Sequence, residues 1–145
     1  MTVSAMKRAA SKAPTVGYSK RSRLDKLGVK PDMRVALIDL DDAGFRRELT
    51  QRTDDVSDRP RPGGDMIVLA VDGPAPLNRL TALRRTIKPE GAIWVVWPKG
   101  QSHIKEDMIR SAAIRQGLVD VKVIAFSETL SGLKLVIPVK LRGSR

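Results

Sequence analysis

Cysteine is absent from the chain, which excludes disulfide bridges, thiolate nucleophiles and cysteine-ligated metal sites and fits a reducing, cytoplasmic location. Aromatic residues make up only 3% of the sequence, so a folded core has to be built from Ile, Val and Leu. The longest apolar runs, residues 35–40 and 93–97, are far shorter than the ~20 residues that span a bilayer. No apolar segment follows the basic N-terminus as it would in a secretory signal peptide. We therefore expect a cytoplasmic protein without membrane association.

Positive charge is concentrated near the N-terminus. The chain carries a net charge of +11, and residues 1–30 contribute +7 through eight Lys and Arg side chains against one acidic residue. Residues 1–15 show no hydrophobic periodicity, which predicts a disordered basic arm. Such an arm is either a solvated tail or a weak, salt-sensitive binder of nucleic acid and other polyanions. The candidate nucleic-acid contacts are Lys7, Arg8, Lys12, Lys20, Arg21 and Arg23.

The remaining sequence has the length and composition of one domain, expected over residues 16–141, with a flexible tail at 142–145. Two nearly continuous apolar runs, residues 34–40 and 65–71, are typical of parallel strands that are buried on both faces. A third strand is expected at residues 92–97, after a turn formed by Pro89-Glu90-Gly91.

Helices are expected after each of these strands. Asp41 and Asp42 can cap a helix that runs to about residue 52, with Phe45 and Leu49 on its buried side. A second helix is indicated by an apolar stripe, and a third, at residues 105–116, by apolar positions before Gly117 at its C-terminal end. The stripe consists of Leu77, Leu80, Leu83 and Ile87, and the inward positions of the third helix are Met108, Ile109, Ala112 and Ala113.

The periodicity changes at the C-terminal end. Residues 119–125 alternate between apolar and polar side chains, and residues 133–137 follow a Ser131-Gly132 turn, which predicts an antiparallel hairpin. The whole order predicts a single Rossmann-like α/β domain of three layers, with a mostly parallel sheet that the C-terminal antiparallel hairpin closes.

From residue 65 onward, the order of strand, helix, Ile87-Lys88-Pro89-Glu90-Gly91 turn, strand, helix and hairpin resembles the second half of class I S-adenosylmethionine-dependent methyltransferases. Between residues 16 and 137 the chain is also similar to a small bacterial family of unknown function. The second resemblance rests on Gly17-Tyr18-Ser19, Lys26-Leu27-Gly28, Trp94 with Trp97-Pro98-Lys99, Gly117-Leu118-Val119-Asp120-Val121-Lys122, and Glu128-Thr129 with Ser131-Gly132-Leu133-Lys134. Together they imply a shortened methyltransferase-like fold and no particular reaction.

The glycine-rich loop of nucleotide and S-adenosylmethionine sites is missing after the first strand. The sequence there is Asp39-Leu40-Asp41-Asp42-Ala43-Gly44, which holds one glycine. Asp41 and Asp42 stand where an anionic group of a ligand requires positive potential. We therefore expect no appreciable binding of S-adenosylmethionine, and no cofactor.

Open α/β sheets bind ligands beyond the carboxyl ends of their strands. Side chains that can bind a ligand follow the predicted strands. The carboxylates can accept hydrogen bonds from hydroxyl groups, the aromatic ring can stack on a flat group, and the cation can pair with an anion. An unidentified small molecule or protein is the expected partner, although a simple turn at Asp72 and core packing of Trp97 are alternatives. The candidate ligand-binding residues are Asp39, Asp72, Trp97, Lys99 and His103.

No catalytic set is found in the sequence. The single histidine, His103, is placed in a loop where solvation is the usual role, and a metal site is not expected without cysteine or a second histidine. Scattered serines lack the pattern of a hydrolase nucleophile. The sequence predicts a non-catalytic Rossmann-like binding or interaction domain. A reduced S-adenosylmethionine-dependent methyltransferase and a nucleic-acid-associated protein that uses the basic arm are the alternatives.

Overall fold

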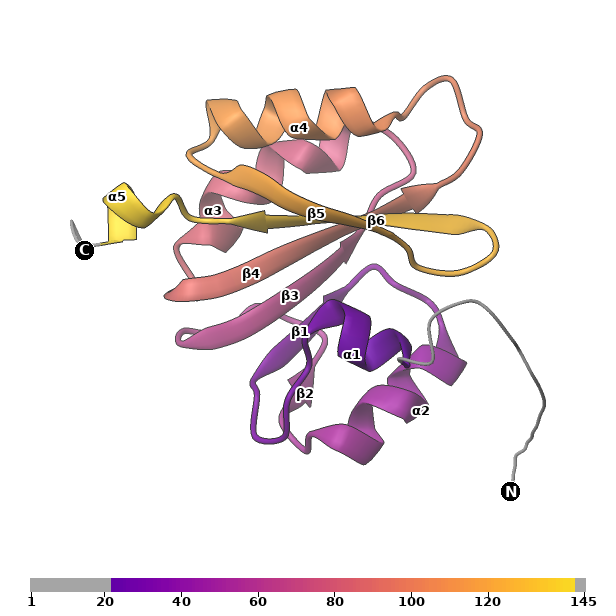
Figure 1. Cartoon of the computed structure of the whole chain (residues 1–145), viewed down its shortest axis with the longest axis vertical. Coiled ribbons are helices and arrows are strands. Elements are labelled where there is room, and N and C mark those ends of the chain that lie inside the picture. The colour runs from indigo at the N-terminus through magenta and orange to yellow at the C-terminus, as the bar shows by residue number, and fades with distance from the viewer. Residues whose placement is uncertain (1–21, 143–145) are drawn as a thin grey trace.

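A six-stranded sheet lies between two layers of helices in the computed structural model, which describes residues 22–142 (Figure 1). Figure 1 shows α3 and α4 on one face of the sheet and α1 and α2 on the other. The elements in chain order are α1 (Arg23–Leu27), β1 (Val35–Ile38), α2 (Ala43–Arg52), β2 (Val56–Ser57), β3 (Gly64–Ala70), the 3-10 helix η1 (Ala75–Arg79), α3 (Leu80–Arg84), β4 (Ile87–Pro98), α4 (Glu106–Arg115), β5 (Val119–Ala125), β6 (Leu130–Val136) and α5 (Val139–Arg142).

The strand order is β2-β1-β3-β4-β6-β5. The first four strands in this order are parallel, whereas β6 runs antiparallel to both β4 and β5. The predicted fold class, a mostly parallel Rossmann-like sheet closed by an antiparallel pair, is therefore confirmed. Because β1, β3 and β4 are parallel, their carboxyl ends reach the same edge of the sheet.

Both faces of the central strands are buried, which explains their continuous apolar runs. In β4, Ile93 and Val95 belong to the core beneath α3 and α4, while Trp94 and Val96 belong to the core beneath α1 and α2. All four side chains are at most 1% exposed. The side chains of consecutive β4 residues therefore point to opposite faces of the sheet up to the carboxyl end of the strand.

Two turns expected from the sequence lie inside strands. Residues 88–91 form an irregular stretch within β4, where the register against β3 shifts. The prediction of a turn at Pro89-Glu90-Gly91 was therefore wrong. Ser131 and Gly132 lie in β6, and the hairpin turns earlier. There the backbone N–H of Phe126 donates to the carbonyl oxygen of Leu130 at 2.9 Å. Gly132 instead leaves room for the indole of Trp94, whose Cε3 would lie 3.4 Å from an added Cβ.

The helix predictions hold with two corrections. The apolar stripe from Leu77 begins in η1 and continues in α3, but Ile87 already belongs to β4. The third helix ends as expected, with Gly117 in the left-handed region at φ +82°. Met108 was expected to point inward, yet it is 36% exposed, because it lies at the border of the buried face of α4.

Several sequence-based predictions concern residues outside 22–142. The disordered arm at residues 1–15, the end of the C-terminal tail and five of the six candidate nucleic-acid contacts, namely Lys7, Arg8, Lys12, Lys20 and Arg21, lie outside the described residues. Within the described range, no helix has the length and apolar character that a membrane crossing requires.

Candidate functional site

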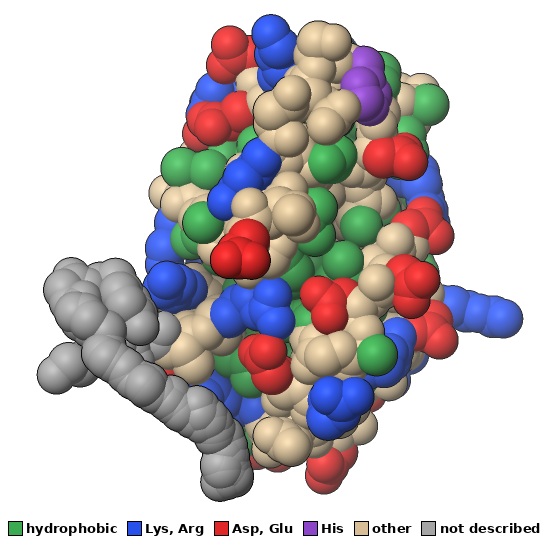
Figure 2. Space-filling model, turned by 90° about the vertical axis from the view of Figure 1, so that its right-hand side faces the viewer, with side chains coloured by type: hydrophobic (Ala, Val, Ile, Leu, Met, Phe, Trp, Pro, Cys, Tyr) green, Lys and Arg blue, Asp and Glu red, His purple; other side chains and the backbone are tan. Residues whose placement is uncertain are grey.

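The carboxyl ends of β1, β3 and β4 surround a cavity of about 440 Å³, which we call the acidic hollow. Figure 2 views the molecule from the side toward which the arrow of β4 points in Figure 1, and it shows acidic, basic and hydrophobic side chains interspersed on this face. Two carboxylates stand among mainly apolar neighbours in the hollow. Its lining consists of Asp39, Ala70, Val71, Asp72, Pro76, Val96, Pro98 and Leu130.

Asp39 follows β1 directly and has a left-handed backbone, with φ at +60°. Glycine adopts this conformation without cost, and Asp and Asn tolerate it better than most residues do. The Asp39 carboxylate forms an ion pair with Arg79 of η1, whose Nη1 lies 3.3 Å from Oδ2. The residue therefore gives the β1–α2 turn a glycine-like geometry and places a carboxylate at the rim of the hollow.

Of the two acidic residues that follow, Asp41 and Asp42, one has a structural role. Asp42 caps α2, because its Oδ1 accepts a hydrogen bond from the backbone N–H of Phe45 at 3.0 Å. This confirms the cap expected from the sequence. Asp41 is exposed and does not line the hollow.

Asp72 also lines the acidic hollow, just past the end of β3. The backbone before it is fixed, because the N–H of the buried Val71 donates to the carbonyl oxygen of Val96 at 2.9 Å. The Asp72 side chain itself is exposed and has no hydrogen-bond or ion-pair partner among residues 22–142. A rigid strand end thus presents an unneutralised carboxylate to the hollow.

A second cavity, of about 490 Å³, opens on the other side of β4, and we call it the basic hollow. Trp97, which is 5% exposed, is part of the core beneath α4 and also lines this cavity. Two lysines and three uncharged polar side chains surround it. The lining comprises Trp97, Lys99, Gly100, Gln101, Ser102, Ile104, Lys105, Glu106 and Ser131.

The five predicted ligand-binding residues therefore fall into separate groups. Asp39 and Asp72 meet in the acidic hollow, and Trp97 and Lys99 meet in the basic hollow. His103 is exposed in the loop before α4 and lines neither. The groups are separate because neighbouring residues of a strand point to opposite faces of the sheet, so that Trp97 lies on the other face of β4 from Val96 and Pro98.

Sequence reasoning missed residues of other elements that line the two hollows or contact their lining residues. Arg79 reaches Asp39 across 40 positions of sequence, and β6 contributes Leu130 to one hollow and Ser131 to the other. The β6 residues could have been found from pairing, since Leu130 and Ser131 lie opposite Pro98 and Trp97 in the antiparallel register. No local signal pointed to Arg79.

Arg23, the one candidate nucleic-acid contact within the described range, is engaged by the fold. Its guanidinium donates to Glu48 at 2.8 Å and to the carbonyl oxygen of Phe126 at 3.1 Å. It also lies 4.9 Å from the ring centre of Phe45 and 4.8 Å from that of Phe126, within cation–π range. These contacts tie α1 to α2 and to the β5–β6 turn.

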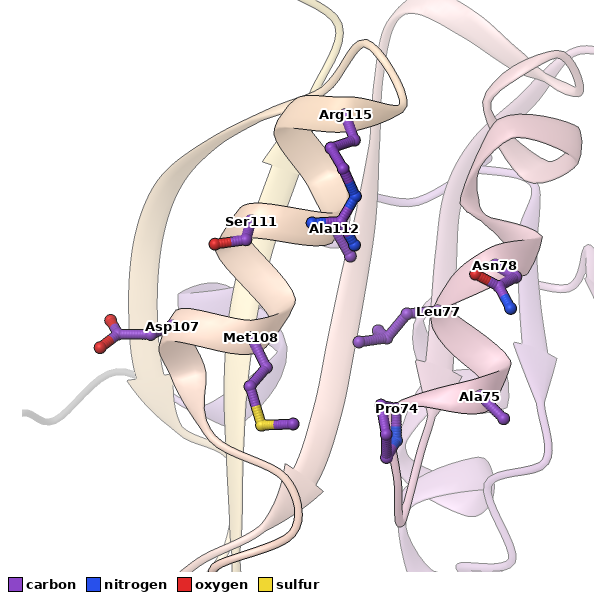
Figure 3. A pocket seen from close by; sticks show the side chains of 9 residues that line it. All are labelled: Pro74, Ala75, Leu77, Asn78, Asp107, Met108, Ser111, Ala112 and Arg115. Carbon is purple, nitrogen blue, oxygen red and sulfur yellow. The ribbon is translucent and has the colours of Figure 1, made fainter.

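A third cavity, of about 630 Å³, lies between η1 and α4 on the outer helical layer. In Figure 3, Met108 of α4 and Leu77 of η1 point into the gap between the helices, while Asp107 points away from it. The side-chain amide of Gln116 bridges the two helices nearby, donating to the carbonyl oxygen of Leu77 and accepting from the N–H of Thr81, both at 2.8 Å. This groove is mainly apolar and lies apart from the strand ends.

No group of three or more His, Asp or Glu side chains is arranged to hold an ion among residues 22–142. The carboxylates of the acidic hollow can attract organic cations and accept hydrogen bonds from hydroxyl groups.

Comparison with known proteins identifies the fold. No family model and no curated protein matches the sequence. A provisionally named methyltransferase from Thermoplasma acidophilum has a TM-score of 0.60 at 9% identity, over 83% of this chain and 76% of that one. A SAM-dependent methyltransferase from Aquifex aeolicus gives 0.54 at 16% identity, over 79% and 87%. CalO1, a methyltransferase of calicheamicin biosynthesis in its SAH-bound form, gives 0.59 at 17% identity, over 79% and 52%.

These likenesses establish a shortened, class I methyltransferase-like Rossmann fold. They also correct the functional interpretation drawn from the sequence. The expected non-catalytic binding domain is contradicted, because the structural neighbours are consistently methyltransferases and favour the methyltransferase alternative. The interpretation from the sequence rested on the missing glycines, but Asp39 adopts the left-handed backbone conformation in this turn without being a glycine.

Proposed function

We propose that this chain is a reduced S-adenosylmethionine-dependent methyltransferase of the cytoplasm and that its acidic hollow binds the methyl donor. The observation that carries the proposal is the pair Asp39 and Asp72, which face one cavity at the carboxyl edge of a methyltransferase-like sheet. In open α/β sheets this edge is where ligands bind. The lack of cysteine supports a reducing compartment.

The charges of the hollow fit the methyl donor. S-adenosylmethionine carries a sulfonium and an ammonium cation together with ribose hydroxyls, and carboxylates attract the cations and accept hydrogen bonds from the hydroxyls and the ammonium. Asp39 and Asp72 supply these groups. Arg79 does not line the cavity, but its guanidinium lies 3.3 Å from the Asp39 carboxylate at the rim and is the positive charge paired with it. The two acidic residues that argued against binding, Asp41 and Asp42, do not line the cavity.

The apolar side chains that line the acidic hollow can pack against the uncharged part of the methyl donor. Val96, Pro98 and Leu130 line the cavity beside the two carboxylates, and an apolar wall with a few placed polar groups is the usual composition of a small-molecule site. The cavity volume of about 440 Å³ lies within the range of ~300–1,000 Å³ typical of such sites. The hollow is thus large enough for a nucleoside-sized molecule.

The bound donor would supply a methyl carbon whose transfer forms one bond to a nucleophile, breaks the carbon–sulfur bond and leaves a neutral thioether and a proton. The protein's part is to orient the two molecules and to exclude water. Asp72, exposed and without a partner in the described range, is the group best placed to accept a hydrogen bond or the released proton.

Titration calorimetry with S-adenosylmethionine and S-adenosylhomocysteine tests the proposal directly. Asp39→Asn and Asp72→Asn should each weaken binding of S-adenosylmethionine by about tenfold, the equivalent of ~1.4 kcal/mol. The loss should be smaller for S-adenosylhomocysteine, which has no sulfonium charge. Asp41→Asn is the matched control, because Asp41 is exposed on the same turn and lies outside the hollow, and it should bind as the wild type does.

The proposal fails if neither compound binds the wild type at millimolar concentration. It also fails if both variants of the hollow bind as tightly as Asp41→Asn does, because the carboxylates would then have no role in recognition. Circular dichroism of each variant separates a binding defect from a folding defect.

A further inference from the structure

We propose that the basic hollow binds a phosphate group of the molecule that accepts the methyl group. This inference rests on the proposed function, and it assigns a class of acceptor: a small phosphate monoester. The inference rests on polar side chains that have no partner among the described residues and that gather around one cavity, on the other side of β4 from the acidic hollow.

Five polar side chains of the basic hollow lack internal partners. Lys99, Gln101, Ser102, Lys105 and Ser131 line the cavity, and none of these side chains forms a hydrogen bond or ion pair with another described residue. Polar side chains elsewhere in the fold are commonly paired, as Arg34, Thr53 and Gln116 are. The hollow therefore presents hydrogen-bonding capacity that the fold does not use.

The charge balance of the basic hollow is positive. Its one acidic residue, Glu106, forms an ion pair with Arg110, four positions further along α4. Arg110 also holds Asp107 and Asp120, but these two carboxylates lie outside the hollow. Lys99 and Lys105 have no such counterion among residues 22–142, so the hollow carries two lysine side chains that are exposed to solvent.

Two lysines with hydroxyl and amide groups match a phosphate monoester. Each lysine ammonium is a compact charge with three donors, and a phosphate monoester carries close to two negative charges above neutral pH. Ser102 and Ser131 offer hydroxyl donors, and Gln101 offers amide donors. A carboxylate would neutralise only one of the two cations, and a phosphodiester of nucleic acid likewise carries a single charge.

Antiparallel pairing joins the two hollows across the end of β4. Trp97 lies opposite Ser131 at the basic hollow, and Pro98 lies opposite Leu130 at the acidic hollow. An acceptor whose phosphate is bound by Lys99 and Lys105 therefore has to extend only across the end of β4 to reach the methyl donor in the acidic hollow. Binding energy from an anchor remote from the reacting atom is a general means of positioning a substrate.

The test is a titration of the ¹⁵N-labelled full chain with inorganic phosphate at pH 8, without S-adenosylmethionine. Amide signals of residues 99–105 and Ser131 should shift and saturate. The double variant Lys99→Gln/Lys105→Gln should lose about tenfold in affinity, as expected for charge-assisted hydrogen bonds. Lys140→Gln, which removes an exposed lysine of α5, should titrate like the wild type. Acetate at equal ionic strength should produce no saturable shift in residues 99–105.

The possible outcomes separate this inference from the proposed function. Asp39→Asn and Asp72→Asn should keep phosphate binding while they lose S-adenosylmethionine. Equal phosphate titrations of the double variant and the wild type would overturn the phosphate site and leave the methyl-donor site untouched. Displacement of phosphate by a single-stranded oligonucleotide at lower concentration than glycerol phosphate, with steep salt dependence, would also overturn it and favour nucleic-acid binding.

Discussion

The indole Nε1 of Trp94 donates a hydrogen bond to the backbone carbonyl oxygen of Leu27 at 3.1 Å, across 67 positions of sequence. Both residues are fully buried. The bond joins the short helix α1 to the central strand β4. Because α1 has only five residues, it depends on such tertiary contacts for its stability.

Trp94→Phe should lower the free energy of unfolding by about 2–4 kcal/mol, because it leaves a buried carbonyl without a partner and opens a cavity. Trp97→Phe is the control, since Trp97 lies on the opposite face and its indole makes no hydrogen bond within the described range. Urea unfolding of the three proteins measures the difference. A loss for Trp94→Phe no greater than that for Trp97→Phe would show that the hydrogen bond to α1 contributes nothing.

The fold was predictable where burial and periodicity agree. Residues 34–40 and 65–71 were found as strands because burial on both faces makes their sequences continuously apolar. For residues 88–91 the sequence predicts a turn, because Pro and Gly mark turns and bulges alike, and only the pairing with β3 distinguishes the two.

The candidate site was predictable in position but not in detail. The rule that parallel strands deliver their carboxyl ends to one edge brought Asp39 and Asp72 together correctly. The same rule cannot assign faces, so it did not separate Trp97 and Lys99 from them. Arg79 was missed because no local pattern encodes its contact with Asp39, which η1 brings about after the chain folds.

A side chain at Gly91 should destabilise the fold. An added Cβ would lie 3.1 Å from the carbonyl oxygens of Asp65 and Lys88, which are backbone atoms that cannot rotate away. Gly91→Ala should therefore cost about 1–3 kcal/mol of unfolding free energy. Gly73→Ala is the matched control, because no atom lies within 4 Å of its added Cβ, and it should change stability by less than about 0.5 kcal/mol. Equal stability of the two variants in urea would disprove the close approach.

Asp55 should make the fold sensitive to acid. Arg34 and Arg61 hold the pKa of the Asp55 carboxyl below its usual value of 3.8, through contacts of 3.1 and 2.5 Å. Since the pKa is lowered by folding, the stabilisation is fully present above pH 3.8 and is lost as the pH falls through the lower, folded value.

Asp55→Asn should accordingly lower the melting temperature by a few degrees at pH 7. The gap to the wild type should close as the pH is lowered below about 4, where the carboxylate of the unfolded chain is already protonated. Asp54→Asn serves as the control, because Asp54 is exposed and has no ion-pair partner in the range 22–142. A melting-temperature difference that stays constant from pH 7 to pH 3 would exclude this role of Asp55.

Removal of the charge of Lys134 should stabilise the fold. It lies directly opposite Lys122 in the β5–β6 pair, and burial, followed by the charge of Lys122, lowers its pKa. Like charges opposite each other in a sheet cost roughly 0.2–1 kcal/mol. Lys134→Met should recover a gain of about this size at pH 7, measured by urea unfolding, because it retains the apolar stem.

The pH dependence of that gain follows from the direction of the shift. A lysine with a lowered pKa in the folded state binds its proton less tightly there than in the unfolded chain, so protonation favours unfolding. As the pH rises through the lowered pKa, the wild type sheds the unfavourable charge and the advantage of Lys134→Met should shrink. Lys140→Met, at an exposed position of α5, should show neither the gain nor its pH dependence. A destabilised Lys134→Met variant at pH 7 would mean that the ammonium has a favourable partner, and the opposition of Lys122 and Lys134 would then carry no cost.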